Sequence, residues 1–189
     1  MALEHAKRKL NIALVSDFFY PRTGGVEMHQ YYLAQCLIAR GHKVIAITGT
    51  FGGKRQGVRY MTNGFRVYYC PQLPLVDQVV APTLFSMFPL MRDIFIREEI
   101  DIVHAHQATS TMGHEAILHA RTMGLRVIYT DHSLFGFASA PAIHLNKLMK
   151  FSLSDASHIV AVSHTDKENL VLRAYLDPVC LNSVSLCVC

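Results

Sequence analysis

The sequence predicts an α/β fold in the form of a Rossmann-like, doubly wound parallel sheet. Helix-length segments separate most of the apolar, β-rich runs along the chain, which is the pattern of a sheet with helical crossovers. The runs also lack strict alternation of apolar and polar residues, as expected when helices cover both faces. Right-handed crossovers then give the doubly wound arrangement. The six runs are Asn11–Ser16, Lys43–Thr48, Phe65–Tyr69, Asp101–Ala105, Arg126–Thr130 and His158–Val162.

The first strand leads into a glycine turn and a helix. Gly24 and Gly25 precede a helical run that starts at Val26, and Gly41 supplies its C-terminal cap. A glycine turn lets the backbone approach an anion and directs the amide groups of the helix N-terminus toward it. The pattern therefore predicts a phosphate site at Gly24 and Gly25. The alternative is a tight turn that uses two glycines without any ligand.

Three further segments have predictable local structure. Gly124 ends a helix over His114–Met123, and Thr165 with Glu168 has capping-box spacing at the start of a helix over Asp166–Tyr175. Residues 52–59 form a glycine-containing basic loop with Lys54, Arg55 and Arg59. We expect this loop to be solvated, with attraction to anionic lipid as the alternative.

The segment Pro82–Glu99 is almost entirely apolar, with arginines at its edge. We expect a helix with a bend at Pro89, because proline removes a helical hydrogen bond. A crossover helix that covers the sheet is the favoured interpretation. A helix on a membrane surface is the alternative.

Composition excludes several classes of protein. The chain has 189 residues, a net charge of +4 and no tryptophan, which argues against a nucleic-acid-binding protein. We expect neither a secretory signal nor a membrane span, because no apolar run reaches the necessary length. Five cysteines lack zinc-site spacing, so we expect no metal, and we interpret the final Cys-Val-Cys as coincidence and not as a prenylation signal.

Candidate site residues lie where predicted strands end. Asp17 and Arg22 flank the glycine turn, and His132 follows the fifth run, at the edge where doubly wound sheets bind ligands. Asp17 has an alternative role in shaping the turn, and Arg22 and His132 have alternatives as ordinary loop residues. His104 and His106 end the fourth run. We expect their side chains to point to opposite faces, so that only one, His106, reaches the cleft and the two cannot share a metal.

The motifs resemble the N-terminal domain of family 4 retaining glycosyltransferases, which have a GT-B fold, and among these the catalytic, class A subunits of phosphatidylinositol N-acetylglucosaminyltransferase. The resemblance covers about residues 9–178, and the segment Thr130–Phe137 is its most specific part. The other matching segments are Gly24–Glu27, Lys54–Tyr60, Tyr68-Tyr69, Leu84-Phe85, His104–His106, Ala120–Leu125 and Ser163–Arg173.

The resemblance implies transfer of GlcNAc from UDP-GlcNAc to phosphatidylinositol, the first step of GPI-anchor synthesis, on the cytoplasmic face of the endoplasmic reticulum. It implies that His132 contacts the transferred sugar near its 6-hydroxyl. Substrate binding would fall to Asp17, Arg22, Gly24, Gly25 and His106, with either a nucleotide diphosphate or the lipid phosphate against the two glycines. No metal cofactor is implied. The implied partners are the phosphatidylinositol acceptor, the other transferase subunits and a peripheral membrane contact.

The expected domain organisation is an N-terminal tail at 1–8, an acceptor-side domain at 9–178 and a divergent cysteine-rich tail at 179–189. The C-terminal nucleotide-sugar domain of the family is not expected in this chain, so we expect it to be inactive alone. The alternative is a noncatalytic isoform that binds the transferase subunits. A nicotinamide-dependent oxidoreductase is disfavoured, because the turn lacks the glycine fingerprint and no acidic residue follows the second strand at Thr48-Gly49.

Overall fold

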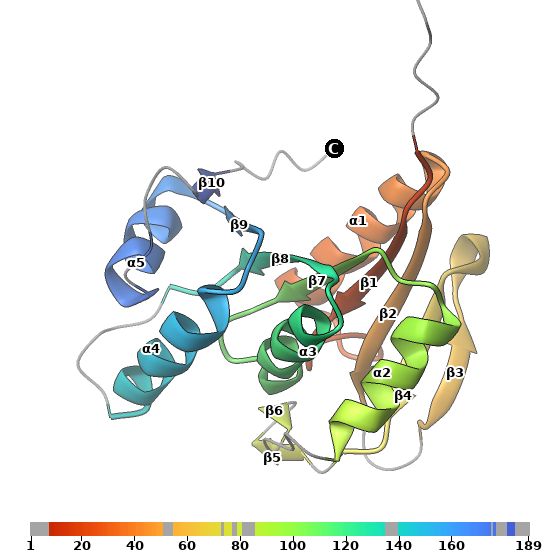
Figure 1. Cartoon of the computed structure of the whole chain (residues 1–189), viewed down its shortest axis with the longest axis horizontal. Helices are drawn as coiled ribbons and strands as arrows, with labels where there is room; N and C mark the ends of the chain where they lie inside the picture. Colours follow the sequence, from red (N-terminus) through yellow and green to blue (C-terminus); the bar gives the residue numbers. More distant parts are fainter. Residues whose placement is uncertain are drawn as a thin grey trace, which may run out of the picture.

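The computed structural model describes residues 8–50, 55–72, 74–76, 79–80, 86–134, 140–174, 176 and 181–183. In these residues, one eight-stranded sheet has the order β10-β9-β8-β7-β1-β2-β4-β3, and β5 and β6 form a separate pair (Figure 1). The strands are β1 (Asn11–Val15), β2 (Lys43–Gly49), β3 (Gly57–Tyr60), β4 (Arg66–Cys70), β5 (Pro74–Val76), β6 (Val79–Val80), β7 (Ile102–His106), β8 (Arg126–Asp131), β9 (His158–Ala161) and β10 (Leu181–Ser183). The helices are α1 (Gly25–Ala39), the short 3-10 helix η1 (Thr62–Gly64), α2 (Met87–Arg97), α3 (Thr111–Thr122), α4 (Ala140–Leu153) and α5 (His164–Ala174).

The six predicted runs are β1, β2, β4, β7, β8 and β9, and all of them pair in parallel. The predicted fold class is therefore confirmed. β10 extends the parallel set beside β9, whereas β3 pairs antiparallel with β4 at the other edge.

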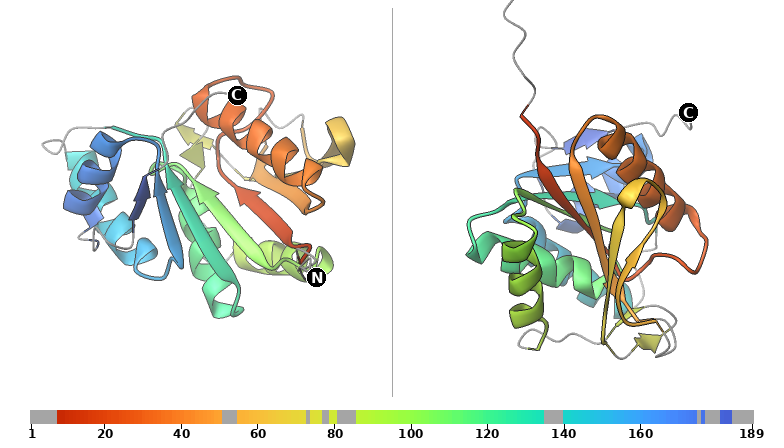
Figure 2. Two further views of the ribbon diagram at one scale, coloured as in Figure 1. Left: turned by 90° about the horizontal axis from the view of Figure 1, so that it is seen from above. Right: turned by 90° about the vertical axis from the view of Figure 1, so that its right-hand side faces the viewer.

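Alternate residues of β1 enter two different cores. Ala13 and Val15 of β1 pack in a cluster with residues of α2, α3, α4 and α5. Ile12 and Leu14 pack on the opposite face, in a cluster with Ala34 of α1. Figure 2 shows α1 and α3 on opposite sides of the sheet. Two covered faces explain why these strands are continuously apolar.

The predicted basic loop is partly wrong. Arg59 lies in β3, whose four residues are exposed and pair antiparallel with β4. Backbone pairing with an available sheet edge outweighs the local glycine content, since Gly57 takes a φ of +80° and still starts the strand. Lys54 lies outside the described residues.

Helix α2 starts later than predicted, and Pro89 falls in its first turn, after Ser86 at the N-cap. A proline there has no helical hydrogen bond to remove, so the predicted bend in mid-helix is wrong. Helix α2 buries four side chains in the same core as Ala13 and Val15, namely Met87, Met91, Ile94 and Phe95. The interpretation as a crossover helix is therefore confirmed, while Pro82–Phe85 lie outside the described residues.

The predicted C-terminal ends of the helices agree with the structure better than the predicted starts do. Gly41 and Gly124 take φ values of +87° and +74°, as expected for C-terminal glycines. Helix α5 starts at His164, and its cap is Ser163, whose Oγ accepts from the Asp166 backbone amide at 3.1 Å. The predicted Thr165–Glu168 cap is therefore placed two residues too late.

The region predicted as a divergent tail contributes strand β10, while 177–180 and 184–189 lie outside the described residues. Among the residues that the structure describes, no helix combines the length and apolar character needed to cross a bilayer.

Candidate functional site

The candidate site lies at the carboxyl edge of the sheet, where the strand order reverses. From β1 the chain proceeds to β2 and β4 on one side, and later to β7, β8 and β9 on the other. Parallel strands that diverge in this way leave a crevice at their carboxyl ends, which is the usual ligand site of doubly wound sheets. The helix after β1, the end of β7 and the residue after β8 all contribute histidines to this place.

His29, His106 and His132 form what we call the histidine cluster. One ring nitrogen from each can be chosen so that all three atoms lie within 4.8 Å of one another. The rings of His29 and His132 are 4.8 Å apart between centroids, and those of His106 and His132 are 5.6 Å apart. His106 is fully buried, whereas His29 and His132 are partly exposed. The cluster thus has one buried member, His106, and two members that solvent can reach.

The prediction that His104 and His106 point to opposite faces is wrong. Their ring centroids are 4.1 Å apart and the rings are inclined by only 30°. Side chains alternate with a period of two in a strand, so residues two apart share a face. His104 therefore packs directly behind His106, and its Nε2 lies 2.7 Å from the Thr130 hydroxyl oxygen.

Burial keeps the cluster uncharged. It lowers the pKa of His132 to about 3, with a further contribution from His29. Burial also lowers the pKa of His106 well below the ordinary value, with His104, His132 and His29 contributing, and it lowers the pKa of His29. At neutral pH these side chains are therefore neutral imidazoles, each with one ring nitrogen that can accept a hydrogen bond or bind a cation.

The hydrogen bonds of the cluster do not use all of its ring nitrogens. His106 Nδ1 and His132 Nε2 are 3.3 Å apart, so one of these nitrogens donates and the other accepts. His106 Nε2 is buried and has no hydrogen-bond partner in the part of the chain that the structure describes. By contrast, His114 uses both ring nitrogens, toward Ser152 Oγ at 2.7 Å and Ala108 O at 2.8 Å. His114 is a structural histidine.

Asp131 shapes the turn that carries His132. Its Oδ1 accepts hydrogen bonds from the backbone amides of His132 at 2.9 Å and Ser133 at 3.3 Å. Burial, reinforced by the negative charge of Asp166, raises the pKa of Asp131 to about 7. Through these two hydrogen bonds the side chain orients the loop after β8.

The glycine turn presents a helix N-terminus at the same edge. Gly24 is the N-cap of α1, makes no side-chain cap bond and has extended backbone at φ −154°. Neither glycine needs positive φ, so the tight-turn alternative does not explain the pair. A Cβ on Gly24 would lie 2.6 Å from Glu27 Oε2, whereas one on Gly25 would meet nothing within 4 Å. The Gly25 side is open to a ligand, and the Gly24 side already faces a carboxylate.

Asp17 and Arg22 have different surroundings. Asp17 is buried, and its carboxylate accepts from Ser110 Oγ, Thr111 N and Met112 N at 2.9–3.2 Å. It therefore caps the start of α3. Arg22 is exposed on the loop before α1. Of the residues predicted to bind substrate, the structure brings His106, His132 and the glycine turn to one edge and gives Asp17 a structural role.

His29 was missed by the sequence prediction, although a signal was present. It lies four residues after Gly25 on α1, which places it about one turn into the helix that follows the glycine turn. The predicted absence of a metal-ligand set relied on spacing along the chain. The fold brings histidines together from three separate elements, which spacing does not reveal.

Solved structures show the same fold. The chain matches sucrose-phosphate synthase from Thermosynechococcus elongatus with a TM-score of 0.66 and 16% identity, over 93% of this chain and 48% of that one. It matches UDP-GlcNAc 2-epimerase from Methanocaldococcus jannaschii with a TM-score of 0.62 and 16% identity, over 94% and 45%. The chain therefore has the Rossmann-like fold of one half of a GT-B enzyme.

Sequence comparison gives a closer relationship. Residues 50–139 match the family PIGA (GPI anchor biosynthesis). The class A subunits of phosphatidylinositol N-acetylglucosaminyltransferase from Arabidopsis thaliana and Homo sapiens are 55% and 54% identical to this chain, each over 90% of it. The chain spans 38% and 35% of the length of these two relatives. It is thus homologous to an N-terminal region of the class A subunits, in agreement with the sequence motifs.

Proposed function

We propose that this chain is the acceptor-side domain of an enzyme that transfers GlcNAc from UDP-GlcNAc to phosphatidylinositol, the first step of GPI-anchor synthesis. The observation that carries the proposal is the 54–55% identity to the class A subunits over nine tenths of the chain. The proposed place of action is the cytoplasmic face of the endoplasmic reticulum membrane, with peripheral contact to the lipid. Other subunits of the transferase are the proposed partners.

The carboxyl edge fits this role chemically. His132 is a neutral imidazole at the rim, suited to hydrogen-bond a sugar hydroxyl without adding a charge. His106 holds the Nε2 of His132 at 3.3 Å and thereby fixes which nitrogen faces the ligand. We assign the acceptor phosphate to the open amides near Gly25 and to the Arg22 guanidinium. This arrangement needs no metal cofactor.

The chain covers only part of the length of its relatives. This chain corresponds to 35–38% of their length, and it matches 43–48% of several solved structures. GT-B enzymes react in the cleft between two Rossmann-like halves. We therefore propose that these residues supply the acceptor half of such a cleft and that transfer needs the other half as well.

The first test measures GlcNAc transfer from labelled UDP-GlcNAc to phosphatidylinositol in membranes to which this chain is added after the endogenous class A protein has been removed. We expect no transfer, although the chain is folded and bound to the membranes. Transfer would contradict the proposed need for a second half of the cleft. The acceptor role is tested separately by sedimentation with phosphatidylinositol vesicles.

The vesicle experiment has a matched control. Arg22→Ala should weaken binding about five-fold, as expected for one lost charge-assisted contact of about 1 kcal/mol. Arg92→Ala removes an exposed arginine on α2, which is not one of the residues assigned to the headgroup, and should leave binding unchanged. Equal effects of both variants would indicate general charge attraction and contradict a headgroup site.

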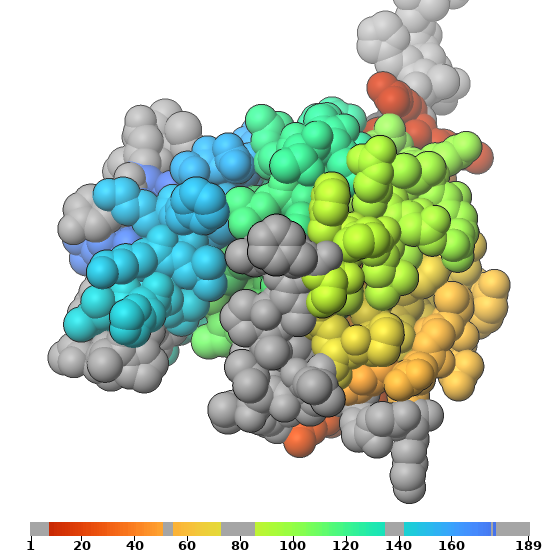
Figure 3. Space-filling view, turned by 60° about the horizontal axis from the view of Figure 1, so that its bottom comes forward, coloured from red at the N-terminus to blue at the C-terminus, as the bar shows by residue number. Residues whose placement is uncertain are grey.

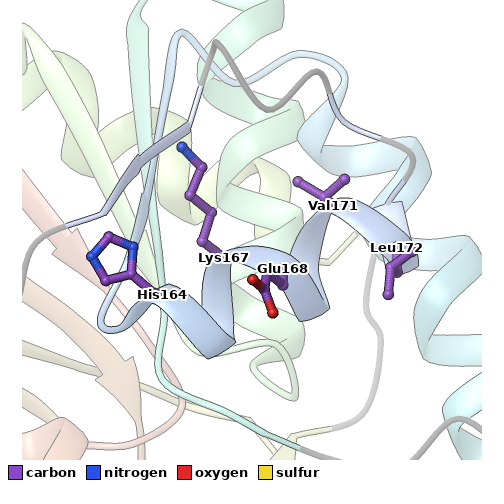
Figure 4. A pocket seen from close by; sticks show the side chains of 5 residues that line it. All are labelled: His164, Lys167, Glu168, Val171 and Leu172. Carbon is purple, nitrogen blue, oxygen red and sulfur yellow. The ribbon is translucent and has the colours of Figure 1, made fainter.

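A noncatalytic role in binding the other transferase subunits is the second candidate. Phe151 of α4 and Leu172 of α5 are large, apolar and about 64–65% exposed. α5 also lines a shallow groove of about 520 Å³ with His164, Lys167, Glu168, Val171 and Leu172 (Figure 4). If this surface binds other subunits, Leu172→Asp should abolish their co-purification and leave vesicle binding unchanged.

A further inference from the structure

The histidine cluster has the composition of a transition-metal site. Each of its three members offers one ring nitrogen, and no two of these atoms are more than 4.8 Å apart. Zinc–imidazole bonds of about 2.0–2.1 Å in tetrahedral geometry require nitrogen atoms about 3.4 Å apart. The His106 Nδ1 to His132 Nε2 distance of 3.3 Å already has this value. A modest movement of His29, whose side chain is partly exposed, completes the geometry.

The surroundings also favour a cation of a particular type. The three candidate ligands are ring nitrogen atoms from α1, from β7 and from the turn after β8, and no carboxylate belongs to the group. Imidazoles suit Zn²⁺, Ni²⁺ and Cu²⁺, whereas Mg²⁺ and Ca²⁺ require oxygen ligands. His106 is held on β7 between His104 and His132, so one ligand is fixed in advance. The unpartnered, buried Nε2 of His106 leaves its protonation free to adapt.

We propose that His29, His106 and His132 form a binding site for one Zn²⁺ or a similar divalent transition-metal ion. The fourth coordination position is filled by water or by an oxygen of a ligand in the cleft. The site is preorganised by the strand end of β7 and by the turn after β8, and His29 closes it from α1. Binding requires no cysteine and no other part of the chain.

The site has a consequence for the proposed transferase role, and this consequence rests on the proposed function. A metal ion on His132 Nε2 would replace the contact with His106 Nδ1 and leave the other ring nitrogen, Nδ1, protonated. Zn²⁺ would therefore prevent His132 from accepting a hydrogen bond from a sugar hydroxyl. The cation is inhibitory in this scheme and not a cofactor, which is compatible with transfer that needs no metal.

The test is a titration of the full chain with Co²⁺, a spectroscopic substitute for Zn²⁺, followed by displacement with ZnCl₂. Accessible cysteines are first alkylated, because thiolates are strong ligands for both ions. We expect one equivalent of Co²⁺ to produce the visible absorption of a four-coordinate ion without thiolate charge-transfer bands. Absence of a stoichiometric site in calorimetry with ZnCl₂ as well would overturn the proposal.

Variants locate the site. His29→Ala and His132→Ala should each weaken Zn²⁺ binding at least ten-fold, while far-UV circular dichroism remains unchanged. His158→Ala, which removes an exposed histidine at the start of β9, should have no effect. Unchanged affinity in both cluster variants, or equal loss in the control, would contradict the assignment. Because the assay contains neither lipid nor nucleotide, its outcome is independent of the proposed transferase function.

Discussion

The two edges of the same sheet carry buried polar groups of opposite character. At the amino edge, Glu98 is 2% exposed and pairs with Lys43 at 3.0 Å and Arg66 at 2.7 Å, and it also accepts from the Tyr68 hydroxyl. These four residues, which we call the Glu98 cluster, join the end of α2 to the starts of β2 and β4. At the carboxyl edge, the histidine cluster is neutral and keeps unused ring nitrogens.

The Glu98 cluster is arranged for stability, whereas the histidine cluster is arranged for binding. The carboxylate of Glu98 is matched by cations and a hydroxyl, so its partners are all within the fold and its role is to hold elements together. The histidines pack against one another and have incomplete hydrogen bonding, so their remaining capacity is available to a ligand. The groove between α2 and β3–β4, about 330 Å³ in volume, is lined in part by Tyr68 of the Glu98 cluster. Figure 3 shows the yellow-green segment of α2 and the orange-yellow segment of β3 and β4 on the same face of the molecule. The groove lies beside the structural cluster and not beside the histidines.

The largest expected effect comes from Glu98. Glu98→Gln leaves Lys43 and Arg66 without their shared anion, and we expect it to reduce the free energy of unfolding by roughly 2–4 kcal/mol. Chemical denaturation measures the change. Glu99→Gln, an identical change at the exposed neighbouring residue, is the matched control and should alter stability by less than about 0.5 kcal/mol. Equal effects at both positions would contradict the structural role of the cluster.

Asp17→Ala should have the next largest effect. Its carboxylate accepts two backbone amides at the start of α3, and loss of such a cap costs about 1–2 kcal/mol. Asp17→Asn retains one acceptor oxygen and should be less destabilising. If Asp17 instead binds inositol, both variants would weaken vesicle binding while the melting temperature stays at the original value.

Acidification should remove the contribution of Glu98. Burial alone would raise the pKa of this carboxyl, but the hydrogen bonds from Tyr68 and Lys43, together with the charges of Arg66 and Lys43, lower it overall below the ordinary 4.5. A depressed folded-state pKa means that the contribution is complete above pH 4.5 and is lost as the pH falls through the lower, folded-state value. The stability difference between the original chain and Glu98→Gln should therefore shrink below pH 4.5. A constant difference down to strongly acidic pH would contradict the ion-pair explanation.

The smallest effect on stability is expected at the carboxyl edge. His29→Ala removes a partly exposed ring for which no hydrogen bond is described, so the free energy of unfolding should change by less than about 1 kcal/mol. His114→Ala is the contrast, because it leaves Ser152 and Ala108 without their buried partner. A larger loss in His29→Ala than in His114→Ala would show that the histidine cluster is structural.

Much of the fold was predictable because the central strands are apolar on both faces, and glycines mark the helix ends. Pro89 was misplaced because the sequence does not show where α2 starts, and a proline has opposite effects in the first turn and in the middle of a helix. β3 was missed because its pairing depends on the edge of β4, which is formed by tertiary structure.

The site was predictable only in part. His106 and His132 follow strands that the sequence identifies, and the carboxyl ends of parallel strands converge. His29 lies one turn after the glycine turn, which was a weak signal in the sequence, but only the packing of α1 against the sheet brings its ring beside His132. The capping role of Asp17 also depends on a contact with residues more than 90 positions away.

The most direct test of the central claim, that the carboxyl edge binds ligand and the amino edge holds the fold, is an NMR titration of the histidine rings with glycerophosphoinositol and then with UDP-GlcNAc. We expect saturable shifts of the His29, His106 and His132 rings, with His114 and His158 unchanged. No shift in the cluster at saturating ligand, or equal shifts at His114 and His158, would contradict the claim.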